Sequence, residues 1–250
     1  MGENGAGKST LIKVLTGVEE FETGTIRMEG SSNTIINRSP QEAQENGIST
    51  VYQEVNLCPN LSVAENLYIG REPKKGPMID WRTMKEDARK LLEGLDVHID
   101  VTMAVENYSI AIQQMIAIAR AVDMSAKVLI LDEPTAGLDP KGRDEILQQI
   151  KKLQTETGLT ILLVSHSMED VAEYVDRIIV MNKGSVMYDD TPREVFKHYK
   201  ELEEVGLAAP QVTYIMHELK ARGADVDVDA TTIEEAAEEI ARVWKQNNQK

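Results

Sequence analysis

Apolar residues along this 250-residue chain follow a helical spacing in some segments and a strand spacing in others, and the two kinds of segment alternate. The first helix is predicted over residues 8–16 and ends at Gly17. Apolar and β-branched runs predict strands over 25–29, 48–52, 128–131, 161–164, 178–181 and 186–188. This alternation is typical of an α/β fold with a mostly parallel sheet.

Strand patterns vanish between about residues 62 and 125. Asp80 is placed to cap a helix whose apolar residues share one face: Met84, Ala88, Leu91, Leu92 and Leu95. A second helix is predicted from Ser109 to about Val122. The stretch therefore resembles a helical subdomain inserted in the α/β core.

Caps and turns mark the remaining elements. Ser39-Pro40-Gln41-Glu42 and Thr191-Pro192-Arg193-Glu194 both match a capping box that opens a helix. Asp139-Pro140 predicts another helix start, and Lys183-Gly184 predicts a hairpin turn. After residue 191 the pattern is helical, and the last helix is expected from near Thr232. Its predicted apolar side, which suits packing or dimerisation, comprises Ala236, Ala237, Ile240, Ala241 and Trp244.

Composition limits the function classes. Apolar residues make up 42% and charged ones 28%, which is ordinary for a globular protein, and no run approaches the ~20 apolar residues of a membrane helix. A single cysteine, Cys58, excludes an intrachain disulfide and fits a reducing compartment. The net charge of −15 argues against duplex nucleic acid as a partner. We expect one main domain over 1–190 and a C-terminal helical extension over 191–250.

The start of the chain carries a phosphate-binding loop with the pattern G-x-x-x-x-G-K-S. It consists of Gly2, Glu3, Asn4, Gly5, Ala6, Gly7, Lys8, Ser9 and Thr10. Glycines allow backbone N–H groups to surround a polyphosphate, Lys8 can reach its outer phosphates, and the Ser9 hydroxyl can bind Mg²⁺. The helix that follows adds the positive end of its dipole. Such a loop normally follows a buried strand, so the first core strand is interpreted as missing.

Two carboxylates end the apolar run Val128-Leu129-Ile130-Leu131. Asp132 would hold Mg²⁺, directly or through water, and Glu133 would orient and deprotonate an attacking water. A solvated acidic turn is the alternative for this pair alone. In a chain with a phosphate loop, the catalytic interpretation is favoured.

His166 follows the apolar run 160–165. Taken alone, a structural hydrogen-bonding role for it has about equal weight, but beside the two motifs a γ-phosphate contact is favoured. The other histidines, His98, His198 and His217, lie in polar or helical surroundings and are expected on the surface.

With Gln53 and Ser109, these residues resemble an ATP-binding-cassette (ABC) nucleotide-binding domain. The residues that fall in the family's order are Lys8, Ser9, Gln53, Asp132, Glu133 and His166, and Ala136-Gly137-Leu138-Asp139 is similar to its D-loop. The signature helix, Tyr108-Ser109-Ile110-Ala111-Ile112-Gln113-Gln114, departs from L-S-G-G-Q. Ser109 is kept, while Ala111 replaces a glycine and its methyl limits close approach. The signature function is therefore weaker than the rest.

The resemblance implies a role for each position. ATP would contact the loop residues of 2–10 and, from a second subunit, Ser109, Ala111 and Asp139. Mg²⁺ would be held by Ser9, Gln53 and Asp132. Catalysis would involve Glu133, His166 and Gln53. The implied fold is a P-loop NTPase with an inserted helical subdomain and C-terminal helices.

Resemblance within the superfamily is divided. Residues 2–139 resemble the first cassette of monosaccharide importers, of the ribose or galactofuranose kind. Residues from about Pro134 onward resemble the ATPase subunits of energy-coupling-factor (ECF) vitamin importers. We interpret the chain as a chimera with a crossover near the shared residues 132–135.

The leading hypothesis is a transport ATPase on the cytoplasmic face of the membrane. It would pair with a second ATPase subunit and drive an integral membrane subunit. Two alternatives remain: a soluble ABC ATPase of DNA repair or translation, and a nucleotide-binding or assembly module that no longer hydrolyses ATP. The altered signature and the missing strand favour the module that does not hydrolyse ATP. The insertions and basic arms that are usual in ABC ATPases of DNA repair or translation are not visible in this sequence.

Overall fold

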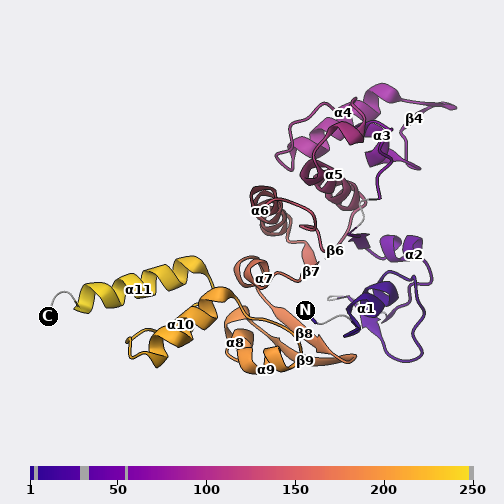
Figure 1. Ribbon diagram of the computed structural model, residues 1–250. Helices are drawn as coiled ribbons and strands as arrows, with labels where there is room; N and C mark the ends of the chain where they lie inside the picture. Colours follow the sequence, from indigo (N-terminus) through magenta and orange to yellow (C-terminus); the bar gives the residue numbers. More distant parts are fainter. Residues whose placement is uncertain (3–4, 29–33, 54–55, 248–250) are drawn as a thin grey trace. The chain divides into compact units, whose positions relative to one another are not determined.

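A computed structural model describes residues 1–2, 5–28, 34–53 and 56–247 of the chain. These residues form two compact units, which are described separately. One unit comprises Ile12–Val164, and the other comprises Met1–Leu11 with Ser165–Lys250. The helix α1 (Lys8–Leu15) contains the first boundary, and the second follows Val164 (Figure 1).

A three-stranded parallel sheet is the centre of the Ile12–Val164 unit. Its order is β3-β6-β7, formed by β3 (Ile48–Val51), β6 (Val128–Asp132) and β7 (Thr160–Val164). In the middle strand Leu129, Ile130 and Leu131 are fully buried, as expected for a continuous apolar run with a neighbour on each side. The prediction of a parallel core sheet is confirmed, and each of these strands agrees with its predicted segment within one residue.

Helices cover this sheet. The helices α2 (Pro40–Glu45) and α5 (Ile110–Asp123) contact β3, part of α1 packs nearby, and α6 (Pro140–Thr157) contacts α5. Ile12 and Ala43 pack with Ile48, Ile130 and Val164 in one buried cluster. Gly17 ends α1 with a left-handed φ of 70°, as predicted.

The segment between residues 62 and 125 is mainly helical, as predicted. It contains α3 (Val63–Tyr68), α4 (Trp81–Glu93), the 3₁₀ turn η1 (Val105–Asn107) and α5, and α3 packs against both α4 and α5. The expectation that it lacks strands is wrong. A short antiparallel hairpin of β4 (Lys74–Lys75) and β5 (Met78–Ile79) lies between α3 and α4. A second two-stranded pair joins β1 (Ile26–Arg27) to β2 (Thr34–Ile35).

The other unit is built around an antiparallel hairpin of β8 (Ile178–Asn182) and β9 (Ser185–Asp190). Lys183 and Gly184 turn it with φ values of 48° and 79°, which confirms the predicted turn and fits a type I′ geometry. The helix α7 (Met168–Tyr174) precedes the hairpin and buries Met168 and Val171 in a shared cluster with Val180. This unit contains no parallel strand pair among its described strands.

Four helices follow the hairpin: α8 (Pro192–Phe196), α9 (Tyr199–Glu204), α10 (Gln211–Ala221) and α11 (Ile233–Asn247). The helical tail is confirmed, while dimerisation through the apolar side of the last helix stays a prediction. Of the residues expected on it only Ala236 is buried, and it packs with Val243, Val212 and Met216. Trp244 is 70% exposed. Within the chain, α10 therefore contacts a narrower stripe of the helix, through Ala236 and Val243.

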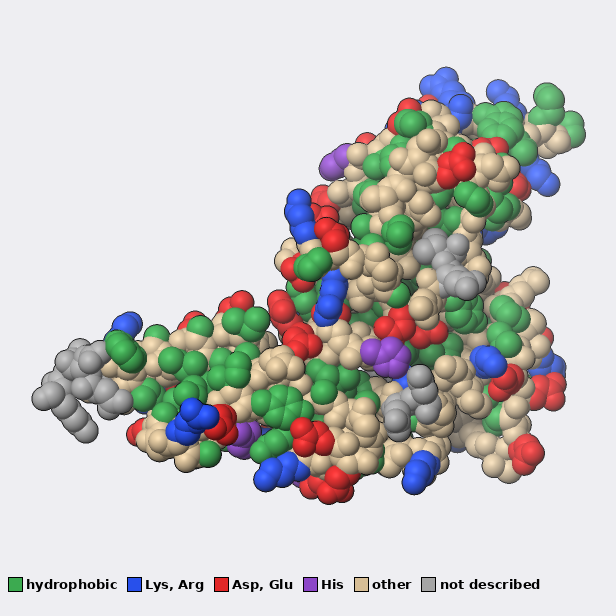
Figure 2. All heavy atoms as spheres, in the orientation of Figure 1, with side chains coloured by type: hydrophobic (Ala, Val, Ile, Leu, Met, Phe, Trp, Pro, Cys, Tyr) green, Lys and Arg blue, Asp and Glu red, His purple; other side chains and the backbone are tan. Residues whose placement is uncertain are grey.

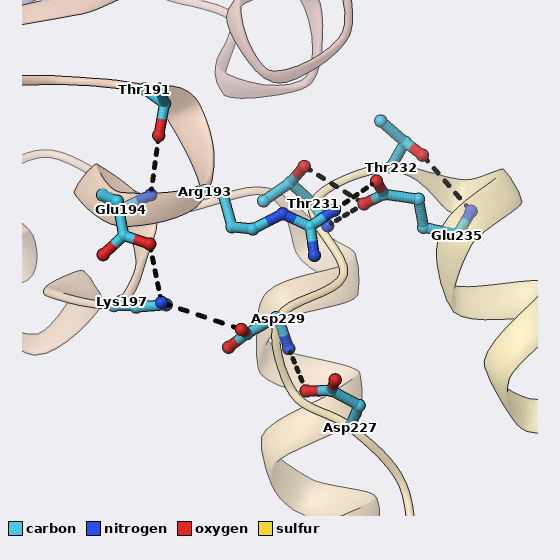
Figure 3. A network of polar contacts seen from close by, with 9 residues as sticks. All are labelled: Thr191, Arg193, Glu194, Lys197, Asp227, Asp229, Thr231, Thr232 and Glu235. Carbon is cyan, nitrogen blue, oxygen red and sulfur yellow. Dashed lines mark hydrogen bonds and ion pairs between the residues drawn. The ribbon is translucent and has the colours of Figure 1, made fainter.

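A polar network fixes the start of α11 to α8 (Figure 3). Arg193 Nη2 lies 2.6 Å from Glu235 Oε1, and Lys197 Nζ lies 3.7 Å from Asp229 Oδ2. Glu235 also accepts from the backbone N–H of Thr231 at 2.8 Å, while its own N–H donates to the Thr232 hydroxyl. The predicted start of the helix near Thr232 is confirmed.

The two capping boxes are half formed. Ser39 and Thr191 accept from the N–H groups three residues on, Glu42 at 3.2 Å and Glu194 at 3.4 Å. The reciprocal bond is absent in both cases. The Glu42 carboxylate accepts from the N–H of Arg38 instead, and that of Glu194 pairs with a lysine side chain.

Among the described helices, none has the length and apolar content needed to cross a bilayer.

Candidate functional site

The phosphate loop lies in the unit formed by Met1–Leu11 and Ser165–Lys250. The Lys8 ammonium donates to the carbonyl oxygen of Gly2, so its side chain reaches back across the loop. The N–H of Leu11 donates to Gly7 at 2.9 Å and continues the helix. The first turn of α1 therefore begins inside the motif, with Ser9 and Thr10 exposed beside it. Asn4 lies outside the described residues.

The β8–β9 hairpin supports this loop. The N–H of Gly184 donates to Ala6 at 3.0 Å, and the Met1 carbonyl accepts from the N–H of Met181 at 2.8 Å. A β-carbon on Gly7 would lie 3.4 Å from the Cα of Gly184. This is an ordinary contact distance, so Gly7 is required for its φ of 98° rather than for space. The sequence carried no signal for this support, because the hairpin follows the loop by about 180 residues.

The acidic pair lies at the carboxyl edge of the β3-β6-β7 sheet, as predicted. Asp132 is the last residue of β6 and is in register with Val164 of β7. The N–H of Glu133 donates to the Val164 carbonyl at 2.9 Å. Gln53 follows the end of β3, which is in register with the same part of β6. Two neighbouring parallel strands, β3 and β6, therefore present Gln53, Asp132 and Glu133 at one edge.

Glu133 adopts an uncommon backbone conformation. Its φ is 50°, in the left-handed region that a glutamate occupies at a cost of about 1 kcal/mol or more. The bond to Val164 holds this conformation, and it turns the chain sharply at the end of the strand. Strain of this kind is found at functional sites but also in plain turns, and Asp96 has a similar φ of 55°.

His166 follows β7 in the chain but belongs to the same unit as the phosphate loop. Its side chain is exposed. The neighbouring residues start α7: Ser165 Oγ accepts from the N–H of Ser167 at 3.1 Å, and Ser167 Oγ accepts from the N–H of Asp170 at 3.2 Å. These caps fix the backbone on the C-terminal side of His166.

The signature and D-loop residues serve as helix caps in this structure. Ser109 Oγ accepts from the N–H of Ile112 at 3.4 Å at the start of α5, and Asp139 Oδ1 accepts from the N–H of Gly142 at 3.1 Å at the start of α6. A β-carbon at position 142 would lie 3.8 Å from the Ala111 methyl. The structure thus places these two helix starts next to each other, with the Ser109 and Asp139 side chains exposed.

A groove of about 790 Å³ runs between the sheet and the helical segment in the Ile12–Val164 unit. It is lined by α2, β3, α5 and the residues after α3, and includes Gln41, Tyr52, Arg71 and Arg120. Burial lowers the pKa of the Arg120 guanidinium, which donates to the Asn56 carbonyl at 2.8 Å. The sequence did not indicate this groove, because its walls come from segments that are far apart in the chain.

The remaining histidines differ in burial. His98 and His198 are exposed, as expected, and His198 stacks on Tyr188 with ring centroids 4.6 Å apart. A hydrogen bond to the Glu201 carboxylate raises the pKa of Tyr188 to about 12. The surface expectation for His217 is only partly right: it is half-buried, with its ring 4.7 Å from that of Tyr199.

Each of the two units, taken separately, has oxygen donors of the kind that bind Mg²⁺. The structure contains no cluster of three or more His, Cys, Asp or Glu side chains among its described residues that would hold a metal unaided. Mg²⁺ at nucleotide sites takes one or two protein oxygens together with phosphate oxygens and water. The hydroxyl of Ser9, the carboxylate of Asp132 and the amide of Gln53 are donors of this kind.

A phosphate loop that opens a helix and an acidic strand end in a parallel sheet define a P-loop nucleotide-binding domain. A family model described as ABC transporter matches residues 1–136, more than half of the chain. The chain therefore belongs to the ABC transporter ATPase family. A second model, described as an AAA domain, putative AbiEii toxin of a type IV toxin–antitoxin system, matches residues 109–169 only.

Relatives of both predicted kinds match. The galactofuranose transporter ATP-binding protein YtfR of Escherichia coli (strain K12) is 46% identical over 185 residues, 74% of this chain and 36% of that protein. The energy-coupling factor transporter ATP-binding protein EcfA2 of Clostridium perfringens (strain 13 / Type A) is 38% identical over 256 residues, 99% of this chain and 87% of that protein. The chain spans about a third of the length of the galactofuranose relative.

Solved structures support the fold. CbiO1 from Clostridium perfringens, described as part of the ABC transporter complex CbiONQ, superimposes with a TM-score of 0.68 and 29% identity, covering 88% of this chain and 85% of that one. The ADP conformation of MJ1267, an ATP-binding cassette of an ABC transporter, superimposes with a TM-score of 0.70 and 29% identity. The match covers 82% of this chain and 84% of that one. The predicted similarity to sugar-importer and ECF ATPases is confirmed, while the chimera with a crossover near 132–135 stays a prediction.

Proposed function

We propose that this chain binds and hydrolyses ATP as the nucleotide-binding subunit of an importer for a small nutrient, a monosaccharide or an ECF-type micronutrient. The observation that carries the proposal is the placement of Glu133. It follows Asp132 at the carboxyl edge of a parallel sheet, in a strained conformation fixed by its bond to Val164. A general base needs such a defined position relative to the water it activates.

Each residue of the proposed site has its own role in the reaction. The loop N–H groups and the start of α1 favour the negative charge of the phosphates, and Lys8 adds a positive charge that can turn from the Gly2 carbonyl to them. Glu133 takes the proton of the attacking water, His166 contacts the γ-phosphate, and Gln53 helps to position the water. Ser9, Asp132 and Gln53 would hold Mg²⁺, which would supply charge neutralisation for the transferred phosphoryl group.

The partners proposed are a second ATPase subunit and an integral membrane subunit. Ser109, Ala111 and Asp139 lie on exposed or half-exposed helix starts, where they can face a nucleotide bound by another subunit. The groove lined by Tyr52 and Arg120 suits a segment of the membrane subunit. The location proposed is the cytoplasmic face of the membrane. We further infer that the helices after Thr191 select an ECF-type ATPase partner.

A nucleotide-binding module without turnover is the second candidate. Ala111 carries a methyl where the family's signature has a glycine, and this methyl limits the approach of a phosphate to the backbone. In that case ATP binds and stabilises the chain, but no phosphate is released.

Two measurements on one sample test the proposal. Saturating Mg-ATP at 100 times its Kd should add about 2.7 kcal/mol to the free energy of unfolding, and phosphate release should accompany it. Lys8→Ala should abolish both, because it removes the charge aimed at the phosphates. Stabilisation without phosphate release favours the second candidate, and no stabilisation at millimolar Mg-ATP refutes both.

A further inference from the structure

The β4–β5 hairpin extends beyond the helices α3, α4 and α5 (Figure 1). It exposes apolar and basic side chains together. Met78 is 71% exposed and Trp81 is 48% exposed. Lys74 and Lys75 are exposed on the partner strand, with Lys75 directly opposite Met78. Figure 2 shows hydrophobic and Lys/Arg side chains side by side in this part of the molecule.

The local charge opposes that of the whole chain. Residues 69–82 contain four basic side chains (Arg71, Lys74, Lys75 and Arg82) and two acidic ones (Glu72 and Asp80), a charge of +2 in a chain of −15. Both acids are engaged with the backbone. Glu72 accepts from the N–H of Gly70 at 3.0 Å, and Asp80 accepts from the N–H of Thr83 at 3.1 Å.

The two lysines differ from the arginines around them. Arg71 pairs with Asp123 at 2.8 Å, and Arg82 pairs with Glu86 at 2.8 Å. Within the described part of the chain, neither Lys74 nor Lys75 has a carboxylate at ion-pair distance. Glu72 and Asp80 attract them only from beyond ion-pair distance, so no ion pair must break when the lysines contact an external anionic partner.

Backbone geometry defines the turn of the hairpin, and hydrogen bonds tie its base to the start of α4. Gly76, with a φ of 64°, precedes Pro77, so the turn fits a type II′ geometry with a positive φ only at its first position. The N–H of Asp80 donates to the Pro73 carbonyl at 2.7 Å, and the Asp80 carboxylate then caps α4. Hydrogen bonds to Thr83 lower the pKa of this carboxyl, so it stays charged. Met78 and Trp81 flank this bonded segment and are 71% and 48% exposed.

We propose that this hairpin and Trp81 form a contact site for anionic phospholipid headgroups. Lysines at the headgroup level, a tryptophan with its indole at the interface and an unbranched apolar residue beside them are the side chains that suit such a surface. The proposal rests on the peripheral membrane location proposed above and adds a direct lipid contact to it. A surface of neutral lipids lacks the negative charge that would attract Lys74 and Lys75. A uniformly acidic protein surface lacks the apolar layer that would cover Met78 and Trp81.

Tryptophan fluorescence gives the test, because the chain has only Trp81 and Trp244. The full chain with Trp244→Phe retains Trp81 alone, and the chain with Trp81→Phe retains Trp244 alone. Vesicles of phosphatidylcholine with 30% phosphatidylglycerol, about a third of it brominated on the acyl chains, are added without nucleotide. Trp81 emission should shift to the blue and be quenched, while that of Trp244 should not change. Quenching of Trp244 alone, or of neither residue, overturns the proposal.

Charge reversal supplies the matched control. Each lysine near an anionic surface is worth about fivefold in partition, so Lys74→Glu with Lys75→Glu should weaken vesicle flotation at least about thirtyfold. Lys220→Glu with Lys245→Glu changes the net charge equally at exposed positions of the other unit and should stay within about twofold of the parent. An equal loss of vesicle binding in both charge-reversed variants refutes a hairpin-specific anionic site. So does binding of the parent to pure phosphatidylcholine vesicles as strong as its binding to the anionic vesicles. Retained Mg-ATP stabilisation in all variants separates this failure from that of the ATPase proposal.

Discussion

Gly2 lies so close to Met181 that a β-carbon at position 2 would come within 2.6 Å of the Met181 carbonyl oxygen and 2.9 Å of the Ala6 methyl. The phosphate loop therefore rests directly on the backbone of β8. This contact explains why the first glycine of the motif is required sterically, beyond the curvature of the loop.

Gly2→Ala should lower the free energy of unfolding by about 1–3 kcal/mol, because neither the carbonyl nor the alanine can move away cheaply. It should also reduce the stabilisation by Mg-ATP, since the loop is displaced. Gly70→Ala is the control. It meets open space but has a φ of 77°, so it should cost about 1 kcal/mol and leave the Mg-ATP effect intact. Denaturant titrations with and without Mg-ATP measure both effects, and an unchanged nucleotide effect in Gly2→Ala would contradict the steric account.

Much of the fold followed from the sequence because local signals and tertiary structure agree. The run Val128-Leu129-Ile130-Leu131 predicts a buried strand, and its acidic end was placed correctly at the sheet edge. The Lys183-Gly184 turn was equally clear. These features depend on a few adjacent residues, so a short segment of the sequence is enough to predict each of them.

Other features depend on distant parts of the chain. The support of the phosphate loop by Met181 and Gly184 joins residues about 180 positions apart. The buried side of α11 is decided by α10, which selects Ala236 and Val243 over the bulkier Trp244. The β4–β5 hairpin has only two residues in each strand, too few for a recognisable alternation.

The Thr213 hydroxyl gives a prediction about stability. This side chain is 2% exposed, and within the described residues its Oγ1 has no hydrogen-bond partner. Thr213→Val keeps the shape and removes the buried hydroxyl, so it should raise the free energy of unfolding by about 1 kcal/mol.

Thr16→Val is the matched variant. The Thr16 hydroxyl is also buried but donates to the Ile12 carbonyl at 2.9 Å, so its loss should destabilise by about 1 kcal/mol. Changes of opposite sign in the free energy of unfolding, measured by urea denaturation of the two variants, support an unsatisfied hydroxyl at Thr213 and a satisfied one at Thr16. Destabilisation by Thr213→Val would mean that an ordered water completes the Thr213 site.

Glu239 gives a prediction about pH. Two hydrogen bonds from Arg242 and one from the N–H of Asp227 lower the pKa of this carboxyl to about 2, from an ordinary value of 4.5. A depressed pKa adds stability that is fully present above pH 4.5 and is lost as the pH falls toward 2. The parent should therefore exceed Glu239→Gln in stability by a constant amount above about pH 5.

Below pH 4.5 this difference should shrink. Chemical denaturation of both proteins between pH 7 and pH 3 measures it, at constant ionic strength to hold screening equal. A difference that stays constant down to pH 3 would show that the effect of Glu239→Gln is not ionic.

The central claim is that Glu133 acts as the general base of an ATPase. Glu133→Gln keeps the side-chain shape and removes its basicity, so phosphate release should fall by about 10²–10⁴-fold while Mg-ATP still stabilises the chain. Single-turnover hydrolysis of radiolabelled ATP, measured beside Mg-ATP binding on the same samples, is the most direct test. The account predicts binding within about threefold of the parent and loss of turnover. Hydrolysis by Glu133→Gln within about twofold of a measurable parent rate would contradict it.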